Sequence, residues 1–152
     1  MAISVTGTNL VPSSTGQAPW EPGHEFTTLS KYTIAATVLT GDVYTFANML
    51  PPLNLAVQLL SVEFYGVELD TNSSPTATLV LGDGTTTNAY LTSKTAGNAV
   101  FQLHYVGDGA NIGTVITVSR NIVATVGGTV ATGQTSGDVF CKVRYRCVGA
   151  QS

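Results

Sequence analysis

Residues 55–91 read LAVQLLSVEFYGVELD, TNSSP, TATLVLGDG and TTTNAYL, and this stretch decides the fold. From Leu60 onward apolar residues occupy every second position, with Leu60, Val62 and Phe64 separated by polar side chains. This period of two is typical of a β-strand with one buried face. The alternation changes phase at Gly66, and a glycine at a phase change indicates a β-bulge.

A second strand follows the central one. The sequence TNSSP, residues 71–75, consists of turn formers. Thr76–Leu81 is apolar or threonine on both faces, as expected of a strand near the middle of a sheet. We therefore predict that the two strands form a hairpin that anchors the core.

Further strands are predicted on both sides of this hairpin. They are Lys31–Leu39, Asp42–Asn48, Ala99–Tyr105, Thr114–Ser119 and Asp138–Val148. Residues 122–126 and 129–132 flank Gly127-Gly128 and are interpreted as a short hairpin. No segment has a helical period, and strands at intervals of roughly 8–12 residues favour an all-β fold, a β-sandwich or jelly roll, over residues 30–152. The predicted core contains Leu60, Val62, Phe64, Leu79, Leu81, Phe101, Leu103, Val143 and Tyr145.

Residues 1–29 differ in kind from the rest of the chain. They hold the only tryptophan, Trp20, between two prolines, and they lack a sustained period. We interpret them as an extended N-terminal arm with a short strand at Ile3–Thr6; a mobile tail is the alternative. Trp20, Phe26 and Leu29 are the arm's candidate interaction residues, because an aromatic anchor often dominates the energy of an interface. We expect this arm to become ordered on a neighbouring subunit or on another partner.

The composition limits the class of protein. At 152 residues the chain is long enough for one domain with a substantial core. Only 10% of residues are charged, the net charge is −3, and 43% are hydrophobic. Such a weakly charged, threonine-rich surface suits packing against other protein, so we expect a homo-oligomer, with a trimer favoured. The charge argues against nucleic acid as a partner. We identify no targeting signal and no membrane span.

The two cysteines are predicted to be unpaired. Cys141 and Cys147 belong to the alternating segment Asp138–Val148 and lie six residues apart on it. On one strand their Cα atoms would be about 20 Å apart, whereas a disulfide requires roughly 7 Å or less. Two buried thiols are consistent with folding in a reducing cytoplasm.

No pattern of catalytic or metal-binding residues stands out. Gly82-Asp83-Gly84 and Gly107-Asp108-Gly109 each offer one carboxylate, too few for a calcium loop, and are interpreted as turns. The two histidines are isolated, and the motifs of phosphate-binding loops, nucleophile elbows and zinc proteases are absent. We therefore predict no enzymatic activity, no metal and no cofactor.

One strand carries half of the basic residues. Lys142, Arg144 and Arg146 alternate along Asp138–Val148 and share one face. Two interpretations remain open. They are either a solvated face paired with Glu63 or Glu68 on a neighbouring strand, or a basic surface that docks on an acidic protein.

The order of these signals over residues 55–148 resembles the small β-sandwich head proteins of tailed bacteriophages. The resemblance rests on the strand ending in Glu68-Leu69-Asp70, on Thr78–Gly84, on Tyr90-Leu91 and on the strands Thr114–Ser119 and Asp138–Val148. It implies a non-enzymatic decoration (cement) protein that binds the major capsid protein as a symmetric oligomer. By the same resemblance, the protein would be made in the host bacterial cytoplasm and located on the capsid surface. The proline-bearing arm and the basic last strand depart from the pattern.

Two alternatives accompany this resemblance. One is another virion module, namely a tail, collar or adaptor protein. The other is a carbohydrate-binding β-sandwich, for which Tyr90, Asn88 and Asp83 are the candidate contacts.

Overall fold

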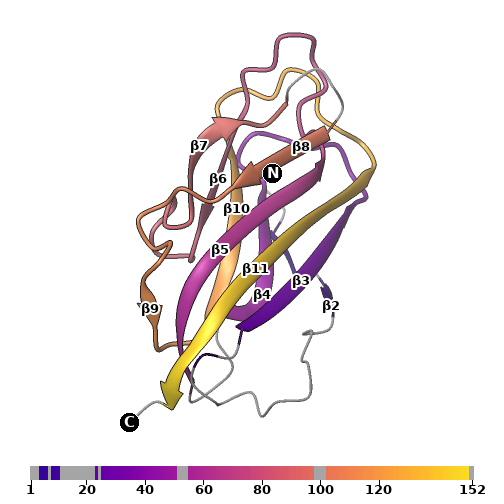
Figure 1. Ribbon diagram of the computed structural model, residues 1–152. Helices are drawn as coiled ribbons and strands as arrows, with labels where there is room; N and C mark the ends of the chain where they lie inside the picture. Colours follow the sequence, from indigo (N-terminus) through magenta and orange to yellow (C-terminus); the bar gives the residue numbers. More distant parts are fainter. Residues whose placement is uncertain are drawn as a thin grey trace.

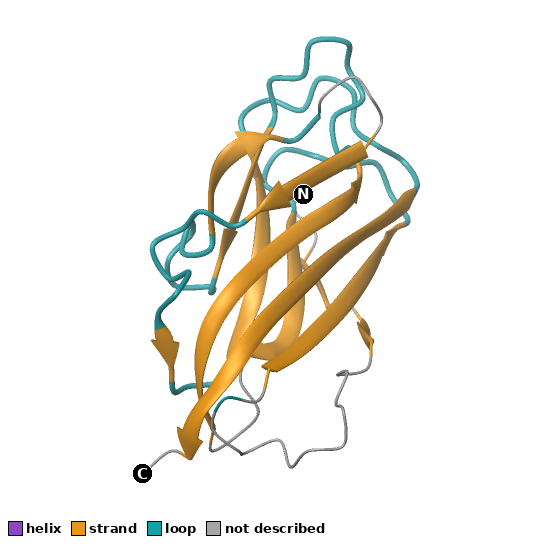
Figure 2. Cartoon of the chain, in the orientation of Figure 1, coloured by secondary structure: helices purple, strands orange, loops and turns teal. Residues whose placement is uncertain are grey.

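The protein is an all-β sandwich of two packed sheets, seen in a computed structural model (Figures 1 and 2). The structure describes residues 4–6, 8–10, 23, 25–50, 55–97 and 102–150. The described residues contain no helix, and so none with the length and apolar character needed to cross a membrane. The prediction of an all-β sandwich is therefore confirmed.

One layer is a five-stranded sheet. In spatial order its strands are β1 (Ser4–Thr6), β4 (Val43–Leu50), β10 (Arg120–Gly127), β6 (Thr78–Gly82) and β7 (Leu91–Thr95). All neighbours in this sheet are antiparallel except β1 and β4, which run parallel.

The other layer is a six-stranded sheet built around its two longest strands, which cross the front of Figure 1. In spatial order it contains β2 (Thr8–Leu10), β3 (Glu25–Ile34), β11 (Gly137–Ala150), β5 (Leu55–Val67) and β8 (Gln102–Val106), with β9 (Val115–Ile116) pairing separately with β5. All the pairs in this sheet are antiparallel.

The core lies between the two sheets. Phe64 on β5 meets Phe46 on β4 edge to face, with ring centroids 6.4 Å apart, and both side chains are fully buried. The structure confirms most of the predicted core. The residues of that prediction found buried are Val62, Phe64, Leu79, Leu81, Leu103, Val143 and Tyr145. Phe101 lies outside the described residues, and Leu60 is only half-buried.

Leu60 departs from the prediction because the bulge in β5 lies there and not at Gly66. On β11, Arg144 pairs with Ser61 and Tyr145 pairs with Leu59, so Leu60 is the extra residue. The bulge shifts by one residue which side chains of β5 point into the core, so Leu59 and not Leu60 is buried there. Gly66 stays in register with both neighbouring strands.

A close approach explains the glycine at position 66. Its φ is +140°, a region that side-chain-bearing residues seldom adopt. A Cβ there would also lie 2.3 Å from the carbonyl oxygen of Asp138. Gly66 therefore lets β5 and β11 approach each other closely.

The predicted hairpin of the two central strands is wrong. β5 and β6 belong to different sheets, and residues 68–77 carry the chain across the sandwich. The predicted hairpin around Gly127-Gly128 is wrong as well, because β10 pairs with β4 and β6 and residues 129–132 form no strand. Both errors have one cause: local alternation identifies a strand but not its partner.

Asp70 holds the crossing segment in place through hydrogen bonds to its side chain. Its fully buried carboxylate accepts hydrogen bonds from the backbone N–H groups of Asn72, Ala77, Ala131 and Thr132, at 3.1–3.5 Å. It therefore joins the crossing segment to the loop between β10 and β11. Buried backbone donors need partners of this kind.

The N-terminal region also differs from the prediction. The strand predicted to begin at Lys31 begins at Glu25, so residues 25–29 belong to the sandwich and not to an arm. Within the arm, β1 agrees with the predicted strand at Ile3–Thr6, and it pairs with β4 of the same chain. β2 pairs with β3 of the other sheet. The described part of the arm therefore lies across both sheets of its own sandwich. Deleting residues 1–23 would remove both of these strand pairings. Such a deletion would therefore alter the sandwich itself as well as any contact of the arm with a partner.

The opposite side of the sandwich is closed by side chains. The hydroxyl of Tyr105, on edge strand β8, donates a 2.8 Å hydrogen bond to the carbonyl oxygen of Thr95 on edge strand β7. The Asp108 carboxylate, just after β8, accepts from the backbone N–H of Thr92 at 2.8 Å and lies 2.5 Å from Nζ of Lys94. These bonds connect the edges of the two sheets, and a connected edge is less open to pairing with another chain.

Neither Cys141 nor Cys147 forms a disulfide, as predicted, and both are fully buried on the inner face of β11. Burial raises the pKa of the Cys141 thiol, because the thiolate would lose its hydration. We expect a thiol reagent to react with neither cysteine in the folded protein and with both after denaturation without reductant. Absorbance titration measures this, and fewer than two thiols in the denatured protein would contradict it.

Candidate binding surface on the six-stranded sheet

The candidate functional site is the outer face of the six-stranded sheet, on β3, β11, β5 and β8. Side chains along a strand alternate between two faces, so the residues between the buried ones of β11 and β5 point outward. On β11 these are Phe140 and Lys142, between Val139, Cys141 and Val143. On β5 they are Glu63 and Tyr65, to either side of buried Phe64. We call this surface the outer face.

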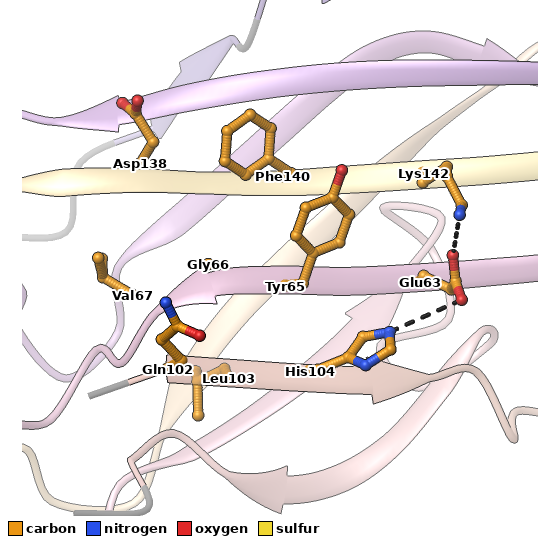
Figure 3. Close-up of a pocket in the computed structure, with 10 residues that line it drawn as sticks. All are labelled: Glu63, Tyr65, Gly66, Val67, Gln102, Leu103, His104, Asp138, Phe140 and Lys142. Atoms are coloured by element: carbon orange, nitrogen blue, oxygen red, sulfur yellow. Dashed lines mark ion pairs between the residues drawn. The ribbon is translucent and has the colours of Figure 1, made fainter. Parts of the chain in front are cut away.

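Two aromatic rings form the centre of the outer face. Tyr65 and Phe140 are direct cross-strand partners, and their rings stack with centroids 5.1 Å apart and planes 12° from parallel. Figure 3 shows both rings broadside above β5 and β11. His104 on β8 meets Tyr65 edge to face at 6.2 Å. Both rings of the Tyr65–Phe140 pair, which we call the aromatic platform, are partly exposed.

A charged row borders one end of the platform. Nζ of Lys142 lies 2.7 Å from Oε2 of Glu63, and Nε2 of His104 lies 3.7 Å from Oε1 of the same carboxylate (Figure 3). The hydrogen bond from Lys142 holds the pKa of Glu63 below its ordinary value, although partial burial opposes the effect. Glu63 is therefore an ionised hydrogen-bond acceptor at neutral pH.

Asp138 lies at the other end of the platform (Figure 3). Its Oδ1 accepts a 2.6 Å hydrogen bond from the hydroxyl of Thr33, and its Oδ2 lies 3.6 Å from Nζ of Lys31. Thus the carboxylates at both ends of the platform have a cationic neighbour.

These residues line an open depression of about 620 Å³. Figure 3 draws the ten lining residues, which are Glu63, Tyr65, Gly66, Val67, Gln102, Leu103, His104, Asp138, Phe140 and Lys142. The depression combines one apolar platform with polar groups at its rim, an arrangement common in binding sites.

The basic residues of β11 pair with acids of neighbouring strands. Lys142 pairs with Glu63, its register partner on β5, and Arg146 lies 2.9 Å from Glu25 on β3. The interpretation of cross-strand pairing with Glu63 is therefore confirmed, whereas Glu68 is fully buried and lies outside this surface. Arg144 lies between the two pairs and is exposed. Docking through Arg144 and its neighbours stays a prediction.

The three candidate residues of the arm have different environments. Trp20 lies outside the described residues. Phe26 is buried in the core and stacks on Tyr145 at 5.3 Å, so its ring is not available as an exposed anchor. Leu29 is half-buried on β3, opposite Lys142 on β11.

Sequence reasoning missed the aromatic platform. Phe140 occupies a polar-face position of β11, in phase with Lys142, and an aromatic at such a position is the signal that was available. Tyr65 lies next to Gly66, where the sequence predicted a bulge, so the sequence did not show which face of the sheet its side chain occupies. Nothing in the sequence indicated that the two side chains are cross-strand partners.

The Gly-Asp-Gly sequences are turns, as predicted. Asp83 accepts hydrogen bonds from the backbone N–H groups of Thr85 and Thr86 at 2.9 and 2.7 Å and pairs with Arg120. Asp108 bonds to strand β7 as described above. Among the residues that the structure describes, no group of three or more His, Cys, Asp and Glu side chains is arranged to hold a metal ion.

Two of the three carbohydrate contacts suggested by the sequence, Tyr90 and Asp83, are wrong, whereas Asn88 is exposed and a contact through it stays a prediction. Tyr90 is fully buried, and burial raises its pKa to about 12. The Asp83 carboxylate is 3% exposed and paired with Arg120. A sugar cannot reach either side chain because both are covered by the protein itself.

Comparisons with known proteins identify the fold. No family model matches the chain, and no curated protein matches it in sequence. Sixteen chains of solved structures are similar to it, among them chains of two phage capsids. A chain of the cyanophage Pam1 capsid asymmetric unit superposes with a TM-score of 0.66 and 24% identity, over 88% of this chain and 91% of that chain. A chain of the Ralstonia phage GP4 capsid superposes with a TM-score of 0.61 and 19% identity, over 91% of this chain and 93% of that chain. The protein therefore has a β-sandwich fold that also occurs in two phage capsid assemblies.

Proposed function

We propose that this protein is a structural component of a bacteriophage virion. The observation that carries the proposal is the shared fold, which covers nearly the whole of this chain and of a chain in each of two phage capsid structures. Within the virion, we assign it the role of a decoration protein that binds the outside of the major capsid shell and stabilises it. It catalyses no reaction in this role.

The physical character of the chain supports a role in assembly. Only 10% of its residues are charged, so a large part of the surface can be buried against protein with little loss of charge hydration. On one side of the sandwich the edge strands β1 and β2 are only three residues long, and on the other the Tyr105 and Asp108 bonds connect edge strands β7 and β8. Short or connected edges offer little for strand pairing, so contacts with a shell would use faces, loops and the arm.

The unit that binds the shell is proposed to be a trimer, because closed symmetry is usual for oligomers and an icosahedral shell has three-fold axes. Trp20 and the exposed Arg144 are the first candidates for its contacts. A tail, collar or adaptor module is the alternative role in the virion, and it requires far fewer copies per particle.

Cryo-electron microscopy of purified particles of the phage that encodes this sequence tests the proposal. We expect density for the sandwich repeated over the outer surface of the head, in groups of three. Light scattering of the isolated protein at micromolar concentration should give the mass of three chains. Copies confined to the tail or to one vertex would support the alternative role, and absence from purified particles would refute a virion protein.

A further inference from the structure

The proposed shell contacts are Trp20 and Arg144, and they leave the aromatic platform and its rim without an assigned role. We propose that the outer face binds a neutral saccharide, with one pyranose ring stacked on the aromatic platform of Tyr65 and Phe140. The site is separate from the buried residues around Tyr90 and rests on different observations.

The platform is an offset stack of two rings. The planes of Tyr65 and Phe140 are 12° from parallel and their centroids lie 5.1 Å apart, so the two rings form a step and not one flat floor. An aromatic face carries partial negative charge. The C–H groups on one side of a pyranose carry partial positive charge, so a sugar ring can stack on an aromatic face of this pair.

The rim supplies the hydrogen bonds that sugar hydroxyls require. Carboxylate acceptors stand at the two ends, Glu63 at one and Asp138 at the other, and the amide of Gln102 lies along the β8 side (Figure 3). Lys142 adds a donor beside Glu63. Each hydroxyl is both a donor and an acceptor, so a rim that mixes the two suits a ring bearing several hydroxyls.

The charge balance favours a neutral ligand. Glu63 is balanced by Lys142, and Asp138 has Lys31 as its neighbour. A phosphate or a polyanion would find no excess positive charge on the platform, and a cation would find no unpaired carboxylate. A protein partner is less well matched, because hot spots at protein interfaces usually fill closed pockets, whereas this depression is open and has polar groups at its rim.

The test uses the full chain and four neutral hexasaccharides: maltohexaose, cellohexaose, mannohexaose and a galactohexaose. Saturation-transfer NMR and calorimetry should detect at least one of them binding with a Kd of about 1 mM or tighter. Phe140→Ala and Tyr65→Ala should each weaken that binding by about tenfold or more. Tyr65→Phe keeps the ring and should retain most of the affinity.

Two further variants separate loss of the site from loss of the fold. Arg144→Ala alters an outward residue of the same strand outside the depression, and we expect it to leave saccharide affinity unchanged. Phe140→Leu keeps an apolar side chain without the ring, so it should fold normally and still lose binding. The proposal is overturned if no hexasaccharide binds at about 10 mM, or if Phe140→Ala binds as well as Arg144→Ala.

A different outcome would identify the platform as a protein contact instead: the parent protein binds no saccharide, and Phe140→Ala no longer attaches to phage heads. Neither binding nor lack of binding of a saccharide tests the proposed role in the virion, which electron microscopy of the particles tests separately.

Discussion

Replacing Phe64 with alanine should lower the free energy of unfolding by about 3–5 kcal/mol, the usual effect of removing a buried aromatic side chain. Phe64 is fully buried at the centre of β5, and its ring meets Phe46 of the opposite sheet edge to face. Few side chains could move into the space, because the surrounding core residues are held by two hydrogen-bonded sheets. Equilibrium unfolding in urea, followed by circular dichroism, measures the loss.

Tyr65→Ala is the matched control for this prediction. It removes an aromatic ring from the next position of the same strand, but that ring lies on the outer face and is partly exposed. It should cost roughly 0.5–1.5 kcal/mol through the lost aromatic pair. Equal losses for the two variants would contradict the assignment of Phe64 to the core and of Tyr65 to the outer face.

The second large effect is expected at Asp70. Asp70→Ala should destabilise the protein by roughly 2–4 kcal/mol, because one buried and three partly buried hydrogen bonds to backbone N–H groups would be lost. The four donors come from the segment that crosses between the sheets and from the loop between β10 and β11. Asp70→Asn keeps one acceptor oxygen, so we expect a smaller loss. The same urea titration measures both variants, and a loss below about 0.5 kcal/mol for Asp70→Ala, the range of ordinary surface changes, would show that the carboxylate does not hold these loops.

Asp70 also predicts how stability depends on pH. Burial opposes ionisation of Asp70, yet hydrogen bonds from four backbone N–H groups outweigh it and hold the pKa below its ordinary value of 3.8. A carboxyl group whose pKa is lowered by folding contributes stability that is complete above the unfolded pKa and is lost as the pH falls through the folded pKa. The pKa of Asp108 is likewise lowered to about 2, first by its hydrogen bond from Lys94. We therefore expect the protein to lose stability between about pH 4 and pH 2, and Asp70→Asn to lose less over that interval than the parent protein.

Several features of the protein were determined by the sequence alone. The alternation of apolar residues identified β5 and β11, and the Asp83 turn and the absence of a disulfide between Cys141 and Cys147 followed from local spacing. These features depend on neighbours along the chain: an alternating strand buries one face wherever its partner lies, and an aspartate in a turn bonds to the next backbone N–H groups.

The tertiary structure decided which strands pair and where each face points. It assigned β5 and β6 to opposite sheets, placed the bulge at Leu60, and paired β1 with one sheet and β2 with the other. It also made Tyr65 and Phe140 cross-strand partners and placed Tyr90 out of reach of any ligand. These outcomes depend on contacts between segments far apart in the chain, and a period of two carries no information about which segment, or which register, supplies the other side of the contact.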